Sequence, residues 1–300
     1  MSTRLSTSKE CRDVYRQILQ GYTHVEEEGF YIKHFKESDL GFIESAYQSC
    51  AKKSAEEGLY TVRQKLEFLK EGEFWTEDEE GKYLTQSLAV KDSYDFLHKI
   101  NDEGQRKNFE EKIIPEQEAL LAKIKTERSE LLEPTVETFC QKQVNELYVY
   151  HALYKDKEFK KPFFSKEEFD DLSFWEVGEM VAKYNKATVR FSDINVKIIA
   201  VNSFFLNAFF MSDDDPVKFF GRNILDLTMF QMNIFSRGKF YKSVLTEGKD
   251  PPEQYYEDDC TDGLFELAKW YDVAHKQILS DREVQINNQK LASARAGRHH

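Results

Sequence analysis

Two pairs of acidic and histidine side chains stand one helical turn apart and could hold a metal ion. They are Asp95 with His98 and Asp272 with His275. Helical di-metal carboxylate proteins need two Glu-x-x-His pairs and two further inward-facing Glu residues, because four carboxylates must balance two ions. Both acids here are the shorter Asp, and their apolar neighbours indicate boundary positions on helices. We therefore expect no metal site and no cofactor.

A second candidate is the acidic segment from Asp258 to Gly263, which begins like a calcium-binding loop. Its third ligand position is Cys260, and its twelfth position, which requires a bidentate Glu, is Lys269. The segment is better interpreted as a helix N-terminus, where carboxylates interact favourably with the helix dipole.

Nucleophilic chemistry has little support in the sequence. The cysteines have no paired short spacing, so neither a disulfide framework nor a CxxC motif is present: Cys11, Cys50, Cys140 and Cys260. Three histidines could each partner a cysteine in the folded chain, although no local signature marks such a site: His24, His34 and His151. Phosphate-binding glycine loops and the GxSxG and HExxH motifs are absent. We expect a protein that is not an enzyme, in a reducing cytoplasm.

The richest segment is 217–245, where Phe and Met residues alternate with Arg and Lys. Such a pattern can stack on single-stranded bases, can line a buried helix stripe, or can form a protein-docking surface. Because the protein is acidic and has no second basic patch, we favour core packing over nucleic-acid binding, and docking stays open. The candidate partner contacts are Phe219, Phe220, Arg222, Met229, Met232, Phe235, Arg237 and Phe240.

The overall composition narrows the class of partner. The 42 Lys and Arg residues against 54 Asp and Glu residues give a net charge of −12, which excludes a duplex nucleic-acid binder. A chain that is 40% hydrophobic and 14% aromatic is not disordered. The longest apolar stretch, 196–211, is shorter than the ~20 residues of a membrane-spanning helix, so we expect a buried helix and no membrane.

The elements that position these residues are predicted to be helices. Only 13 Gly and 6 Pro residues interrupt the chain, and Ser or Thr repeatedly precedes Glu by three residues, which is a helix-capping signal: Thr76 and Glu79, Ser165 and Glu168, Ser173 and Glu176. Two long helices, about 76–100 and 105–133, are predicted to form a hairpin, and Pro115 predicts a kink or the true start of the second. Further helices are expected at 39–57, 61–72, 135–153, 174–186, 193–211, 227–246 and 262–280.

The predicted fold class is therefore mainly α, with a long helical hairpin and a Phe-rich C-terminal helical bundle. The polar stretch 154–162 suggests a boundary between an N-terminal helical region (1–155), which contains the hairpin (76–133), and the bundle (163–285). Residues 286–300 are expected to form a disordered tail.

Two segments, residues 125–154 and 219–231 (FFGRNILDLTMFQ), resemble those of the helical, acidic, Phe- and Lys-rich structural and assembly proteins of tailed bacteriophages. The resemblance implies a virion component or an assembly factor that acts through protein contacts, in the host cytoplasm or the virion. It transfers no functional residue.

We thus expect a non-enzymatic protein–protein interaction protein, whose partners are virion or assembly proteins or further copies of itself. One alternative is an acidic regulator that inhibits a host nucleic-acid-binding protein through faces such as 26–28 and 77–80. Another is an enzyme with an unrecognised helical active site that gathers Asp95, His98, Asp272 and His275.

Overall fold

The computed structural model describes residues 4–97, 100, 102–255 and 261–296, with side chains up to Arg282 in the last helix. The chain is 74% helical, with a small three-stranded sheet, so the predicted mainly α class is confirmed. It divides into two compact units. Unit 1 comprises residues 1–41 and 146–300, and unit 2 comprises residues 42–145. The boundary expected at 154–162 lies inside unit 1, because the first 41 residues pack with the C-terminal part of the chain.

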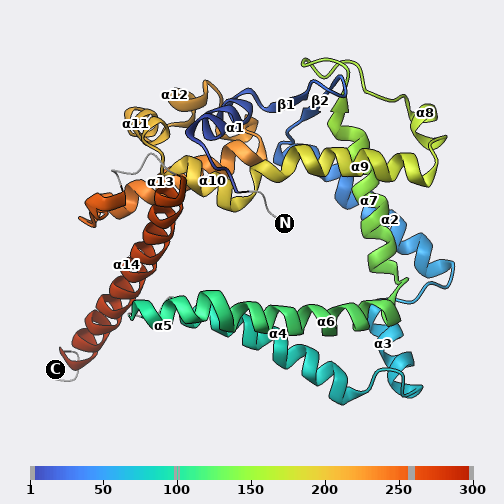
Figure 1. The fold of residues 1–300 in the computed structure, drawn as a ribbon, viewed down its shortest axis with the longest axis horizontal. Coiled ribbons are helices and arrows are strands. Elements are labelled where there is room, and N and C mark those ends of the chain that lie inside the picture. The colour runs from blue at the N-terminus through green and yellow to red at the C-terminus, as the bar shows by residue number, and fades with distance from the viewer. Residues whose placement is uncertain (1–3, 98–99, 101, 256–260, 297–300) are drawn as a thin grey trace. The chain divides into compact units, whose positions relative to one another are not determined.

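Unit 1 contains most of the helices and the whole sheet (Figure 1). Its helices are α1 (Ser8–Gln20), α8 (Lys166–Asp170), α9 (Phe174–Thr188), α10 (Asp193–Ala200), α11 (Ser203–Met211), α12 (Pro216–Phe220), α13 (Met229–Thr246) and α14 (Thr261–Ala296), with short 3-10 turns at Glu37–Leu40, Val189–Phe191, Ile224–Asp226 and Glu253–Tyr255. The backbone of α14 is helical through residues 286–296, where the sequence predicts a disordered tail.

The core of unit 1 lies where α1, α10, α13 and α14 pack against one another. It is rich in β-branched and aromatic side chains that have almost no contact with solvent: Val14, Ile18, Val196, Ile198, Ile199, Phe205, Phe209, Ile234, Tyr241 and Tyr271. The helix expected at 193–211 is broken at Asn202, whose side chain accepts a hydrogen bond from the Phe204 amide and caps α11.

Within the described residues, no single helix is long and apolar enough to cross a membrane. The bent pair Phe174–Ala200 and Ser203–Met211 meets the length and composition criteria only when its members are taken together.

The sheet of unit 1 is antiparallel, in the order β1 (Tyr22–Val25), β2 (Phe30–Lys33) and β3 (Leu153–Tyr154). A turn over 26–29 joins β1 to β2 and places Val25 opposite Phe30. Gly29 adopts a left-handed backbone in this turn, at φ 70°. The acidic run 26–28 thus lies at the tip of a β-hairpin.

Unit 2 is built around the predicted long hairpin. Its helices are α2 (Gly41–Glu56), α3 (Val62–Glu71), α4 (Glu77–Leu97), α5 (Glu103–Asn108) and α6 (Ile114–Leu132), together with a π-helical turn at Phe109–Ile113; α7 (Val136–Ala152) begins in unit 2 and ends in unit 1. Helices α4 and α6 lie side by side and are joined through α5 and the π-helical turn (Figure 1). Pro115 stands in the first turn of α6, in agreement with the predicted true start of that helix.

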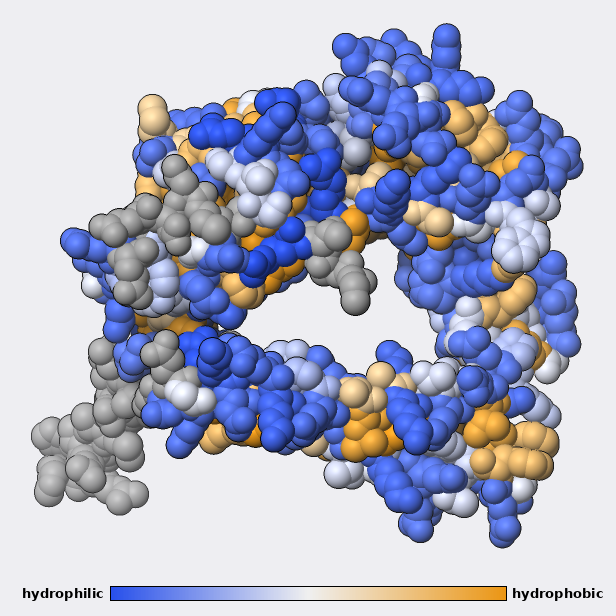
Figure 2. Space-filling view, in the orientation of Figure 1, coloured by the Kyte–Doolittle hydropathy of each residue, from blue (hydrophilic) through white to orange (hydrophobic). Residues whose placement is uncertain are grey.

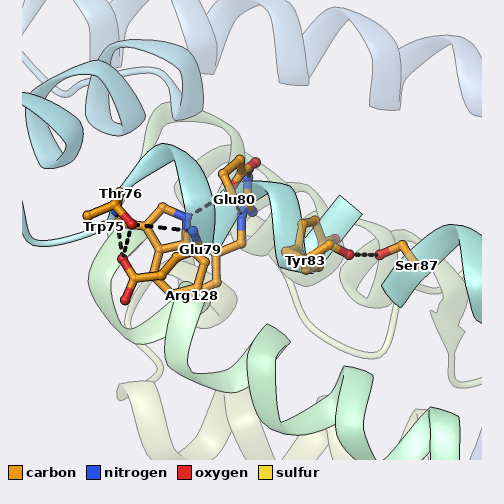
Figure 3. Close-up of polar contacts among 7 residues, drawn as sticks. All are labelled: Trp75, Thr76, Glu79, Glu80, Tyr83, Ser87 and Arg128. Atoms are coloured by element: carbon orange, nitrogen blue, oxygen red, sulfur yellow. Dashed lines mark hydrogen bonds and ion pairs between the residues drawn. The ribbon is translucent and has the colours of Figure 1, made fainter. Parts of the chain in front are cut away.

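A polar cluster fixes one end of the hairpin (Figure 3). The Arg128 guanidinium on α6 makes two hydrogen bonds to the Glu80 carboxylate on α4, with N–O distances of 2.8 and 2.9 Å. The Trp75 indole also donates to Glu80, at 2.8 Å. The Arg128 bonds hold the pKa of Glu80 below its usual range. Arg128 lies 4.7 Å from the Tyr83 ring centroid, so the cation is partly covered by an aromatic face.

The predicted capping pair Thr76 and Glu79 is present at the start of α4. The Thr76 backbone amide donates to the Glu79 carboxylate at 2.6 Å, and the Glu79 amide donates to the Thr76 hydroxyl at 3.3 Å (Figure 3). The pairs Ser165 with Glu168 and Ser173 with Glu176 form the same boxes on α8 and α9. The sequence signal for helix starts is therefore confirmed at all three positions.

Candidate functional site

The Phe-rich segment predicted to contain partner contacts forms a compact, capped structure in unit 1. Asp215 caps α12 by accepting a hydrogen bond from the Val217 amide at 2.8 Å, and Gly221 ends that helix in a left-handed conformation, at φ 69°. Thr228 then caps α13 in a reciprocal box with Gln231. Three caps within about a dozen residues fix the course of the backbone here.

One side of this segment is anchored in the core. The Phe219 and Phe220 rings lie 4.7 Å apart and both contact Phe235, at 6.1 and 5.8 Å between centroids. Gln231, which is fully buried, donates from its side-chain amide to the backbone carbonyl of Ile18 at 2.9 Å. The anchored side therefore contacts α1 as well as α13, and its position does not depend on a partner.

The other side presents large apolar side chains to solvent. Their exposed fractions are 48% for Val217, 50% for Ile224, 84% for Leu225 and 43% for Met229. We call these four residues, together with the exposed Arg222, the 217–229 face. Single exposed apolar residues are common on proteins, and four of them within thirteen positions of one capped segment make this stretch the candidate contact surface.

A cavity of about 350 Å³ lies at this face. It is lined by Lys36, Val217, Gly221, Arg222, Asn223 and Asp226. Lys36 neutralises Asp226 across a 3.0 Å contact, so the positive charge of Arg222 is not balanced by that acid. The site thus combines apolar surface with a net cation, an arrangement that can hold an apolar side chain next to a carboxylate of a partner.

The eight predicted contact residues differ in their exposure to solvent. Arg222 and Met229 are exposed, whereas Phe219, Phe220, Met232, Arg237 and Phe240 are half-buried. Phe235 is only 3% exposed and belongs to the core, which corrects its place among possible partner contacts. Arg237 is engaged inside the chain, because it donates to Asp193 at 2.9 Å. Val217, Ile224 and Leu225 carry no sequence signal that marks them as contacts, although Leu225 is among the most exposed large apolar residues of the described chain.

Of the two acid and histidine pairs considered as metal ligands, the structure describes both members only of Asp272 with His275. Asp272 contacts Lys197 at 2.8 Å and Arg237 at 3.9 Å, so its charge is balanced by cations. The His275 ring lies 4.2 Å from the Phe240 ring. No group of three metal-ligating side chains occurs in the part of the chain that the structure describes. His98 and the segment 258–260 lie outside the described residues.

Two of the three histidines considered as cysteine partners, His24 and His34, have other contacts. His24 stacks on Tyr31 at 4.2 Å, and His34 shares a 2.9 Å hydrogen bond with the Thr23 hydroxyl. Burial lowers the pKa of His34 to about 3 and raises the pKa of Cys11 to about 11. His34 therefore stays neutral at physiological pH, and Cys11 stays a thiol.

Searches of protein-family models, of curated protein sequences and of solved structures each gave no match to this chain.

Proposed function

We propose that this chain is a non-enzymatic protein that binds another protein through the 217–229 face. The observation that carries the proposal is the exposure of Leu225 and Ile224 on a backbone held by three helix caps. A rigid apolar surface loses little conformational entropy on binding, so its burial contributes directly to affinity. Arg222 adds a residue type that is enriched among the few interface residues that supply most of the binding energy.

The partner that we propose is a virion structural or assembly protein, or a second copy of the chain, in a reducing host cytoplasm. The support is the resemblance of residues 125–154 and 219–231 to structural and assembly proteins of tailed bacteriophages. The net charge of −12 supports a protein rather than a duplex nucleic acid as the partner.

The alternative of an acidic inhibitor has weaker support. Part of each acidic face is engaged in contacts within the chain, because Glu28 pairs with Lys183 at 2.8 Å and Glu80 pairs with Arg128. Glu79 caps the start of α4. Carboxylates that already have partners attract a basic protein less strongly than free ones.

The test is co-expression of the full chain with the proteins encoded beside it, followed by size-exclusion chromatography. We expect a complex with the wild type and its loss with Leu225→Asp, because a charge placed in the centre of an apolar interface is desolvated without a partner. Leu279→Asp on α14 is the matched control, since Leu279 is exposed at 51% in the same unit and lies outside the face. Equal binding by both variants would contradict the proposed surface, and the absence of any complex with the wild type would contradict the proposed function.

A further inference from the structure

Two cysteines and one serine meet between two helices of unit 2. Cys50 and Ser54 stand one turn apart on α2, and Cys140 projects from α7. The Ser54 hydroxyl lies 3.8 Å from the Cys50 sulfur and 3.8 Å from the Cys140 sulfur. After burial, the neighbouring Cys50 thiol is the next influence that raises the pKa of Cys140. Residues that are 90 positions apart in the chain thus place two sulfur atoms against the same hydroxyl group.

The two thiols differ in their access to solvent. Cys140 is fully buried and Ser54 is nearly so, whereas Cys50 is half-buried. Burial raises the pKa of the Cys140 thiol to about 11, so this thiol is protonated at neutral pH. A reagent in solution therefore meets Cys50 first, and Cys140 can react only with a group already attached at Cys50.

We propose that Cys50 and Cys140 are an oxidisable pair that closes to a disulfide when the protein meets a low-molecular-weight disulfide such as oxidised glutathione. In the first step, the Cys50 sulfur, as its thiolate, attacks the oxidant. The sulfur–sulfur bond of the oxidant breaks, one thiol is released, and a mixed disulfide forms on Cys50.

In the second step, the Cys140 sulfur attacks the Cys50 sulfur and displaces the second thiol. The proton of Cys140 leaves to solvent or to the departing thiolate. Two protein thiols are then oxidised to one disulfide, and one oxidant disulfide is reduced to two thiols. Ser54 is a positioning residue in this step, because its hydroxyl can donate a hydrogen bond to the developing Cys140 thiolate.

The position of the bond gives it a structural effect. A link between residues 50 and 140 encloses α3, α4, α5 and α6, and therefore the whole hairpin. The apolar cluster of this region consists of Leu69, Trp75 and Leu132, with a few partly buried neighbours. A crosslink that closes a long loop restricts the unfolded chain most, so oxidation stiffens the unit that has the smaller core.

The remaining described cysteine serves as an internal control. Cys11 is fully buried among the core residues of α1 in unit 1, and it belongs to a different packing cluster. We expect no reaction at Cys11 under conditions that oxidise Cys50 and Cys140.

The experiment uses the native full-length chain, incubated with oxidised glutathione at neutral pH without denaturant. Alkylation, digestion and mass spectrometry should then identify a peptide containing Cys50 linked to a peptide containing Cys140, with the intact mass lowered by two hydrogen atoms. Dithiothreitol should restore both thiols. In the oxidised protein, amide hydrogen exchange should slow in α2 and α7 and across the hairpin.

Three variants separate the steps. Cys140→Ser should stop at a stable glutathione adduct on Cys50, and Cys50→Ser should leave Cys140 unmodified. Ser54→Ala should slow the second step by roughly tenfold while leaving the first unchanged, so the mixed disulfide should accumulate. A merely structural role of Ser54 would not produce this intermediate.

Three results in the wild-type protein would overturn the proposal without any need for a variant. They are a glutathione adduct that persists on Cys50, a bond that forms only in denaturant, and a disulfide that joins Cys50 to Cys11 or Cys260.

Discussion

Units 1 and 2 are both mainly helical but are stabilised differently. Unit 1 buries large side chains completely, among them Phe205, Phe209, Tyr241 and Tyr271. The hairpin of unit 2 joins its helices through polar contacts such as Ser93 with Gln117, at 2.7 Å. Burial of apolar area contributes roughly 25 cal/mol per Å² to the free energy of unfolding, whereas a hydrogen bond contributes about 1 kcal/mol net. We therefore expect unit 1 to gain more stability from its contacts than unit 2 does.

Unit 2 also leaves many large apolar residues exposed. They are Tyr60, Phe68, Phe74, Leu84, Leu88, Tyr94, Phe96, Leu120, Leu131 and Phe139. In Figure 2, hydrophobic residues interrupt the hydrophilic surface along α4 and α6. A regular, well-capped helical hairpin can therefore form while much of its apolar surface stays outside the core.

The largest expected difference is in the response to side-chain truncation. Phe209→Ala in unit 1 should lower the free energy of unfolding by about 3 to 5 kcal/mol, because it leaves a cavity among Phe205, Phe219 and Phe235. Leu88→Ala in unit 2 should change it by less than about 0.5 kcal/mol, because this side chain is exposed. Urea unfolding measures both. Equal costs would show that the outer side of α4 is covered in the folded protein.

The second difference concerns two helical glycines. A Cβ at Gly238 would lie 2.6 Å from the Phe209 ring, so Gly238→Ala should destabilise unit 1 by about 1 to 3 kcal/mol. Gly81 in α4 has open space around it, so Gly81→Ala should stabilise the hairpin by about 0.5 to 1 kcal/mol through helix propensity. Hydrogen exchange of peptides from each unit measures the two effects separately. Stabilisation by Gly238→Ala would show that the Phe209 ring can move to make room for the added methyl group.

The third test is acidification, which should weaken unit 1. The pKa of buried His34 is about 3 in the folded chain, below the value of 6.5 in the unfolded chain, so only the unfolded chain gains this proton as the pH falls through 6.5. The loss should reach roughly 2 kcal/mol at pH 5 and should grow until the pH approaches 3. Urea unfolding at pH 7 and pH 5 measures it. The variant His34→Gln should have a smaller pH dependence than the wild type, and an identical slope would show that His34 is not the cause.

The smallest effect should come from the polar cluster of unit 2. Arg128→Lys keeps the positive charge but cannot make both hydrogen bonds to Glu80, so we expect a loss of about 1 kcal/mol. Arg63→Lys is the matched control, because Arg63 pairs with Glu67 on an exposed surface and should show no measurable change. Fluorescence of Trp75, which donates to Glu80, should report the difference. Equal changes in stability for the two variants would show that the hydrogen bonds between Arg128 and Glu80 do not stabilise unit 2.

Local signals in the sequence predicted the helices well, because caps and apolar spacing act within a few residues. Thr76, Ser165 and Ser173 mark helix starts in both the sequence and the structure. The strands β1 and β2 were missed, although aromatic and β-branched residues flank the turn at 26–29, because each strand has only four residues.

Long-range packing and exposure could not be derived in the same way. The grouping of residues 1–41 with unit 1 depends on contacts such as that of Gln231 with Ile18, for which no spacing rule exists. For the candidate site, the aromatic pattern selected the segment that contains the proposed 217–229 face, but it also included Phe235, which is buried. Leu225 and Ile224 are exposed because a 3-10 turn rather than a regular helix presents them.

Unit 1 is made of two segments that are separated in the chain by unit 2, and this arrangement affects the order in which the units fold during translation. The apolar side of α1, with Val14 and Ile18, packs in a core with α10 and α13. A ribosome that adds 5 to 20 residues per second needs on the order of 10 to 40 s to make the chain between Ile18 and Gln231. Residues 42–145 are synthesised before α10 and α13, so the hairpin is complete while α1 is still without these packing partners. Translation therefore allows the hairpin to form first and leaves α1 as the segment that a nascent-chain chaperone would meet.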